Sequence, residues 1–142
     1  MYLTYDEYLA FGGASTLEET AFNDLEFEAR TIVDWWTYNR LQNEEEYPEA
    51  VKRCMYKLIT LIFTRQQAQL LNGGNDTVSN STGVGIVQQS NDGVSTTYNI
   101  MSAGEIISQS EEDIKSTIRM YLSNVRNSLG RKVLYRGLYP GE

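Results

Sequence analysis

Few side chains in this sequence have the types and spacing that catalysis needs. Histidine is absent and Cys54 is the single cysteine, which excludes histidine-based triads, thiolate clusters and every zinc site that uses histidine. Three groups of carboxylates remain: Glu18 and Glu19, residues 44–46, and residues 111–113. A catalytic pair of carboxyl groups needs burial or a coupled partner to separate its pKa values. We expect these groups at helix starts or in a loop, where capping and the helix dipole explain them.

Two further features have a structural interpretation beside a functional one. Cys54 lies on the apolar face of a predicted helix, which favours a thiol in the core over a reactive one. Trp35 and Trp36 are adjacent on another predicted helix and point about 100° apart, so we expect one in the core and one at a boundary or a subunit interface. The sequence has no glycine-rich phosphate loop and no nucleic-acid-binding motif. We therefore expect no enzyme activity, no cofactor and no metal.

Length and composition are those of a globular protein. The 142 residues favour a single domain, 1–142, and 41% of them are hydrophobic and 22% charged. No apolar run approaches the ~18 residues that a membrane span needs, and the first residues lack the pattern of a secretion signal. The sequence therefore predicts a protein made in a reducing cytoplasm, with no membrane partner.

Charge is distributed unevenly along the chain. The formal net charge is −7, but residues 1–50 contribute −10 and residues 114–142 contribute +5. Opposite charge at the two ends favours head-to-tail self-association or a charged partner. A solvated acidic surface beside a basic C-terminal helix is the alternative interpretation. A pI near 4.6 argues against sequence-specific DNA binding.

Hydrophobic periodicity predicts a mainly α fold, a small helical bundle of three long helices plus short ones with an inserted β-hairpin. Capping boxes at Thr4 and at Thr16 open a short helix and then a long one, which ends near Asn39. Pro48 starts the next long helix, which runs to Leu71. Over residues 58–63 this helix is apolar on most of its sides, so we expect it to be the central, most buried element.

The second half of the chain begins with a predicted mobile loop over 72–83. A period of two then predicts a β-hairpin over 84–100, because asparagine, aspartate and glycine between two alternating segments are typical of a hairpin turn. The residues at this turn are Ser90, Asn91, Asp92, Gly93 and Val94. A lone hairpin is marginally stable in water, so it needs the helices or a neighbouring subunit to lie against.

Two capped helices are predicted next, a short one at 102–105 and a long one that begins at Ser110 and ends at Gly130. The C-terminal tail, 130–142, is apolar for a chain end, and its side chains need a surface to bury against. The tail residues that we expect to dock on a partner are Val133, Leu134, Tyr135, Arg136, Leu138 and Tyr139.

Several stretches, in order along nearly the whole chain, carry a likeness to one family. They are Tyr2-Leu-Thr-Tyr-Asp-Glu-Tyr8, Glu28-Ala-Arg-Thr-Ile-Val-Asp34 with Thr37-Tyr-Asn-Arg-Leu41, Pro48-Glu-Ala-Val-Lys52, Ser90-Asn-Asp-Gly-Val-Ser95 and Leu134-Tyr-Arg-Gly137. In these stretches the chain resembles the head–tail connector (adaptor, or head-completion) proteins of long-tailed bacteriophages and prophages. The second tryptophan, the long loop before the hairpin and Thr96-Thr97 depart from the family and bear on the particular phage and its host.

The resemblance implies a small helical protein that assembles as a homo-oligomeric ring, commonly of twelve copies, beneath the portal protein at the capsid vertex. The ring would extend the channel through which double-stranded DNA passes, and it would bind the next neck or tail-completion protein. Its place would be the neck of the virion, after synthesis in the bacterial cytoplasm. Residues 90–94 would line the channel or a subunit interface, and the apolar tail would dock on the portal.

Three other interpretations stay open. An acidic interaction protein, an inhibitor or DNA mimic, would act as a monomer or dimer through the acidic N-terminal helix, but it would leave the hairpin and the tail without a role. Another neck or tail-completion component would differ from the first interpretation only in its partner. An enzyme based on carboxylates would need a convergent site that the sequence does not indicate.

Overall fold

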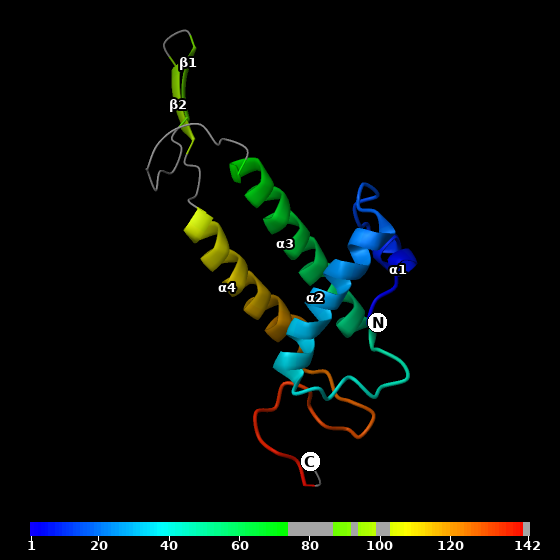
Figure 1. Ribbon diagram of the computed structural model, residues 1–142. Helices are drawn as coiled ribbons and strands as arrows, with labels where there is room; N and C mark the ends of the chain where they lie inside the picture. The colour runs from blue at the N-terminus through cyan, green and yellow to red at the C-terminus, as the bar shows by residue number, and fades with distance from the viewer. Residues whose placement is uncertain (74–86, 92–93, 99–102, 141–142) are drawn as a thin grey trace.

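The computed structural model describes the backbone of residues 1–73, 87–91, 94–98 and 103–140, and the side chains of residues 1–70 and 109–140. Within these ranges the chain is mainly helical, as predicted. Its helices are α1 (Tyr5–Ala10), α2 (Glu19–Thr37), α3 (Glu49–Gly73) and α4 (Ala103–Leu122). α3 lies between α4 on one side and α1 on the other, and α2 crosses in front of it (Figure 1).

α3 supplies the centre of the hydrophobic core, as its apolar stripe predicts. Its buried side chains are Val51, Cys54, Met55, Leu58, Ile59 and Ile62. The α2 side chains packed in the same core are Phe22, Leu25, Ala29 and Val33, and those of α4 are Ile118 and Leu122. Full burial of such a side chain contributes about 1.5–3 kcal/mol, so the contact among these three helices is the main source of stability.

The capping box that opens α1 is confirmed. Thr4 Oγ1 accepts a hydrogen bond from Glu7 N–H at 3.3 Å, and the Glu7 carboxylate accepts one from Thr4 N–H at 3.0 Å. The same carboxylate accepts a hydrogen bond from Lys52 Nζ of α3. This hydrogen bond with Lys52 is the main cause that lowers the pKa of Glu7, and the capping bonds add to it. α1 is thereby fixed to the central helix as well as to α2.

The second capping box, at Thr16, is wrong. α2 begins at Glu19, and its N-cap residue Glu18 makes no capping hydrogen bond through its side chain. Leu17 is buried, and its carbonyl accepts a hydrogen bond from Tyr5 Oη at 2.7 Å. Leu17 N–H in turn donates to the carbonyl of Ala14 at 3.1 Å. These contacts hold residues 14–17 in a turn, so the helix starts only after them.

α2 ends close to the predicted residue because its last turn is followed by two left-handed residues. Tyr38 has φ 54° and Asn39 has φ 58°, and the N–H groups of both donate to the carbonyl of Asp34. Asparagine tolerates this region of φ, whereas tyrosine occupies it rarely. The reversal places Tyr38 at the end of α2, on the surface of the molecule, where it is 52% exposed.

The two helices predicted in the last third of the chain form one helix. α4 runs without a break from Ala103 to Leu122, so Ser110 is an interior residue rather than an N-cap. The carboxylates at 111–113 also lie inside the helix, where capping does not explain them. A capping serine is only a weak local signal, and packing of the helix along α3 overrides it.

The predicted end of the last helix at Gly130 is also wrong, because α4 ends at Leu122. After it the chain folds back: Val125 and Val133 are both buried, and Val133 N–H donates to the Val125 carbonyl at 3.1 Å. Leu129, which the periodicity placed on the apolar face, is 70% exposed in the loop between them. A turn after α4 therefore buries Val125 and Val133, and the hydrophobic periodicity of the sequence did not predict this turn.

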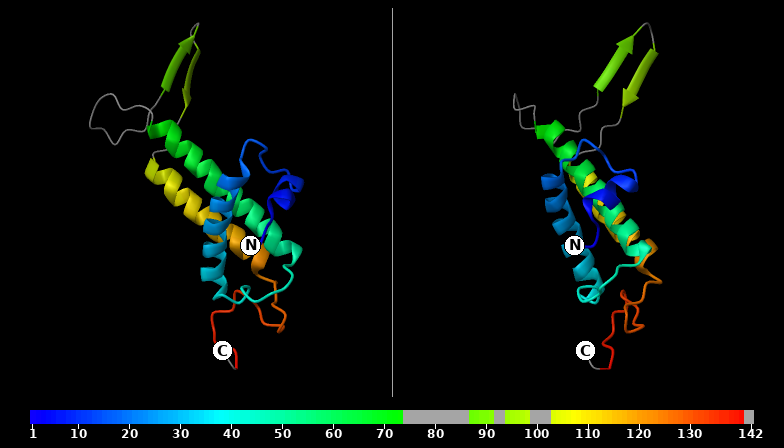
Figure 2. Two further views of the ribbon diagram at one scale, coloured as in Figure 1. Left: turned by 45° about the vertical axis from the view of Figure 1, so that its right-hand side comes forward. Right: turned by 90° about the vertical axis from the view of Figure 1, so that its right-hand side faces the viewer.

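Two strands follow α3 in the chain, β1 (Val87–Asn91) and β2 (Val94–Tyr98). They pair antiparallel, with Val87 opposite Tyr98, and lie beyond the ends of α3 and α4, away from the core (Figures 1 and 2). The predicted loop began at residue 72, but α3 continues to Gly73. The rest of that loop, and the turn residues Asp92 and Gly93, lie outside the described residues. The inserted hairpin as a functional element therefore stays a prediction.

Candidate functional site

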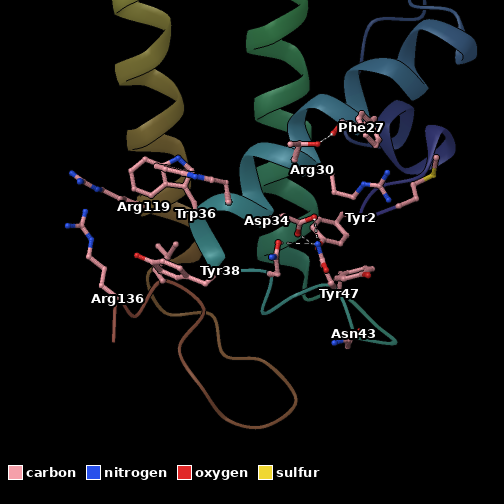
Figure 3. A pocket seen from close by; sticks show the side chains of 16 residues that line it. Tyr2, Phe27, Arg30, Asp34, Trp36, Tyr38, Asn43, Tyr47, Arg119 and Arg136 are labelled. Atoms are coloured by element: carbon pink, nitrogen blue, oxygen red, sulfur yellow. Dashed lines mark hydrogen bonds between the residues drawn. The ribbon is translucent and has the colours of Figure 1, made fainter. Parts of the chain in front are cut away.

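A groove of about 1270 Å³ curves around the C-terminal end of α2. Figure 3 shows Tyr2, Tyr47 and Asn43 on one side of it, and Arg119 of α4 and Arg136 of the tail on the other, with α2 between them. Three separate parts of the chain therefore build its walls: the N-terminal segment with the α2–α3 loop, the last turns of α2, and α4 with the tail.

The rim of the groove carries large aromatic side chains that the chain itself leaves exposed. Phe27, Trp35 and Tyr38 are 62%, 73% and 52% exposed. Trp36 is half-buried, and its ring meets that of Trp35 edge-on with 5.4 Å between centroids. The prediction of one tryptophan in the core and one at a boundary is met only in part, because Trp36 is half-buried against the core and Trp35 faces solvent. Clustered exposed aromatic rings are typical of surfaces that bind another protein.

One side of the groove, which we call its basic half, is formed by Trp36, Arg119, Leu134 and Arg136. The Arg119 guanidinium lies 6.0 Å from the centre of the Trp36 ring, and both arginine side chains are exposed. Among the residues that the structure describes, no carboxylate lies within salt-bridge distance of Arg119 or Arg136. The basic half thus offers two guanidinium groups beside an aromatic ring, a combination suited to carboxylates.

The opposite side of the groove is a hydrogen-bonded network around the Asp34 carboxylate. The Tyr2 hydroxyl donates to Asp34 Oδ1, and Gln42 Nε2 donates to Asp34 Oδ2 at 3.3 Å. The Tyr2 ring lies 4.5 Å from that of Tyr47. Burial raises the pKa of Tyr2 far above its usual value, and the hydrogen bond to Asp34 adds to the shift. The phenol therefore stays protonated and acts as a structural donor.

A buried carboxylate fixes the N-terminus beside this network. Glu26 of α2 is 2% exposed, and its Oε1 accepts a hydrogen bond from Tyr2 N–H at 2.7 Å. Its Oε2 lies 3.8 Å from Arg30 Nε, one turn along the same helix. Helical spacing places Glu26 on the same face of α2 as Phe22 and Ala29, so a carboxylate within the apolar stripe is the signal that marks it. Its role is to hold the first residues against the wall of the groove.

Arg40 holds the C-terminal tail in place. Its Nη1 donates to the carbonyl of Tyr135 and its Nη2 to that of Gly137 at 2.8 Å. The guanidinium lies 5.2 Å from the centre of the Tyr38 ring and 5.1 Å from that of Tyr139. Tyr139 Oη also accepts the Lys132 N–H at 2.9 Å. The tail is therefore a folded strap on its own chain, which no sequence motif indicates because backbone carbonyls are its main acceptors.

The structure separates the tail residues that we expected to dock on a partner. Val133 is fully buried in the chain's own core, which corrects its assignment to the docking set. Leu134 is half-buried against the same core, and Tyr139 is half-buried between Arg40 and Arg131. The remaining three face outward: Tyr135 is 50% exposed, Leu138 is 84% exposed and Arg136 lines the groove.

The other candidate residues are not brought together. Ser90 and Asn91 lie in β1 and Val94 lies in β2, and their side chains are outside the part of the chain whose side chains the structure describes. Cys54 is fully buried as predicted, and burial raises the pKa of its thiol to about 12. Among the described carboxylates, Glu44 accepts hydrogen bonds from Ser128 N–H at 3.0 Å and is a structural contact. These groups do not converge on one site.

A comparison of the chain with models of protein families, with curated proteins and with solved structures found no significant match. In the part of the chain that the structure describes, no helix is both long enough and apolar enough to cross a membrane.

Proposed function

We propose that this chain is a structural connector of a long-tailed bacteriophage, forming a ring of about a dozen copies beneath the portal and linking head to tail. The observation that carries the proposal is the exposed aromatic rim of Phe27, Trp35 and Tyr38 around the groove. A protein that works alone rarely leaves a cluster of this kind exposed. A second copy of the chain would cover it, and repetition of that contact would close a ring.

The charge of the chain fits passage of DNA through such a ring. A formal net charge of −7 disfavours tight binding of phosphates, which would slow a sliding duplex. In this proposal the hairpin around residues 90–94 lines the channel or lies against the neighbouring subunit. Its position beyond the ends of α3 and α4, away from the core, leaves it open to either contact (Figure 1).

The tail is the proposed contact with the portal protein. Tyr135 presents an aromatic side chain to solvent and Leu138 presents an aliphatic one, while Arg40 fixes the backbone carbonyls of Tyr135 and Gly137. An ordered strap loses less conformational entropy on binding than a free chain end would. The opposite face of the ring would receive the next neck or tail-completion protein. The role is architectural and needs no catalysis or cofactor, and its place is the neck of the virion.

Replacing Tyr135 and Leu138 together by alanine is expected to weaken attachment to the portal at least about 30-fold, because truncation of an interface anchor typically costs about 2 kcal/mol. Binding of the variant to the cognate portal protein, measured by surface plasmon resonance, tests this. Met120→Ala is the matched control, since Met120 is 70% exposed on α4 and lies outside the tail. Wild-type affinity in the double variant would show that the tail does not dock there.

A further inference from the structure

The geometry points to a specific occupant for the basic half of the groove: the acidic edge of a second copy of this chain. We define the acidic edge as Asp6 of α1 and Glu18, Glu19 and Asp24 at the start of α2. The inference deepens the proposed function and rests on it, because it names the two surfaces that meet between neighbouring subunits.

The basic half is built to receive carboxylates. Arg119 and Arg136 come from α4 and from the tail, 17 residues apart in the sequence, yet they lie on the same side of the groove (Figure 3). The Trp36 ring beside Arg119 gives the site an apolar surface on which a neighbouring helix can pack. Arginine presents a planar fork of donors that matches a carboxylate, and partial removal of water strengthens the pair.

Within the part of the chain that the structure describes, the acidic edge makes no salt bridge. Asp6, Glu18, Glu19 and Asp24 are all exposed. Among the described residues, the carboxylates in salt bridges are Glu7, Glu26 and Glu49, none of which belongs to this edge. The helix dipole favours negative charge at Asp6 and Glu19, which lie in the first turns of α1 and α2. It does not supply a counter-charge, so the edge stays available to a partner.

The two surfaces lie on opposite sides of the molecule. α1 lies on one side of α3 and α4, which carries Arg119, lies on the other, and α2 crosses α3 from the α1 side to the α4 side (Figure 1). A contact between surfaces on opposite sides is heterologous: each copy binds one neighbour through its groove and another through its edge. Repetition of such a contact produces a ring or a filament, whereas a two-fold dimer would need the same patch on both copies.

Charge reversal with mixing tests the pairing. The test uses sedimentation velocity at 0.15 M salt, with the portal added if the wild type forms rings only in its presence. Arg119→Glu/Arg136→Glu and Glu19→Lys/Asp24→Lys are each expected to weaken self-association at least about 100-fold, because like charges then face each other. An equal mixture of the two variants restores opposite charges at every contact, so it is expected to recover oligomers of wild-type size. The mixture is decisive because a general loss of stability would not be repaired by mixing.

Matched controls carry the same charge change elsewhere. Lys115→Glu/Lys132→Glu and Glu111→Lys/Glu112→Lys alter exposed residues outside the two surfaces, and each is expected to keep wild-type association. Wild-type association in either test variant, or no recovery in the mixture, would overturn the pairing while leaving the connector proposal intact if the wild type still forms rings with the portal. A wild type that stays monomeric with and without portal would overturn both.

Discussion

Trp35→Ala is expected to abolish self-association while leaving the monomer folded. Trp35 is 73% exposed on the outer face of α2, so its removal opens no cavity in the core. Substitutions at exposed positions usually change the free energy of unfolding by less than about 0.5 kcal/mol. At an interface, in contrast, a central tryptophan typically contributes 2 kcal/mol or more, which is about 30-fold in the affinity of each contact. Closure of a ring repeats that loss at every contact.

Sedimentation velocity measures the association of this variant, and thermal unfolding followed by circular dichroism measures its stability. Leu129→Ala is the matched control, because Leu129 is 70% exposed and lies outside the groove. Oligomers of wild-type size in Trp35→Ala would show that the aromatic rim is not the contact between subunits.

Arg40→Met is expected to release the tail and to lower the free energy of unfolding by about 2 kcal/mol. The change keeps most of the aliphatic stem but removes the donors to the carbonyls of Tyr135 and Gly137. Hydrogen bonds to charged groups contribute about 1.5–3 kcal/mol each, and the partial exposure of these bonds reduces the total. The chain around Arg40 is otherwise unchanged, so the helical core is expected to remain folded.

Hydrogen exchange of the segment 132–140 measures the release directly. Tyr135 N–H donates to the Lys132 carbonyl at 3.3 Å in the folded tail. Its exchange is expected to accelerate about 30-fold in Arg40→Met, because a loss of about 2 kcal/mol in the stability of the folded tail corresponds to that factor. Arg53→Met is the control, because the Arg53–Glu49 pair is exposed on α3 and is worth at most about 0.5 kcal/mol. Unchanged exchange in Arg40→Met would mean that other contacts hold the tail.

The sequence was sufficient to predict the helical core and the start of its first helix. The stripe on α3 and the inward position of Cys54 follow from a period of 3.6, and burial confirms both. The capping box at Thr4 was predictable because both of its bonds form within four residues. Thr16 and Ser110 show the limit of the same signal: tertiary contacts at Leu17 and along α4 override a local capping preference.

The groove could not be predicted because it joins residues that are distant in the chain. In the sequence, Trp36 is one of two adjacent tryptophans, Arg119 is one cation of a basic helix and Arg136 is one residue of the tail. None of these features alone indicates a groove. Their proximity depends on α4 ending at Leu122 and on the tail turning back beneath α2. Arg40 was missed for a related reason: its guanidinium donates to main-chain carbonyls of the tail, and every sequence offers such acceptors equally.

The mass of the purified chain in solution, with and without the cognate portal protein, tests the central claim most directly. Native mass spectrometry at high protein concentration would resolve the number of copies from the 16.2 kDa mass of one chain. We expect closed rings of about a dozen copies, formed by the chain alone or once the portal is added. A strict monomer or dimer that does not bind the portal would contradict the connector and favour an acidic interaction protein that acts through its acidic N-terminal helix.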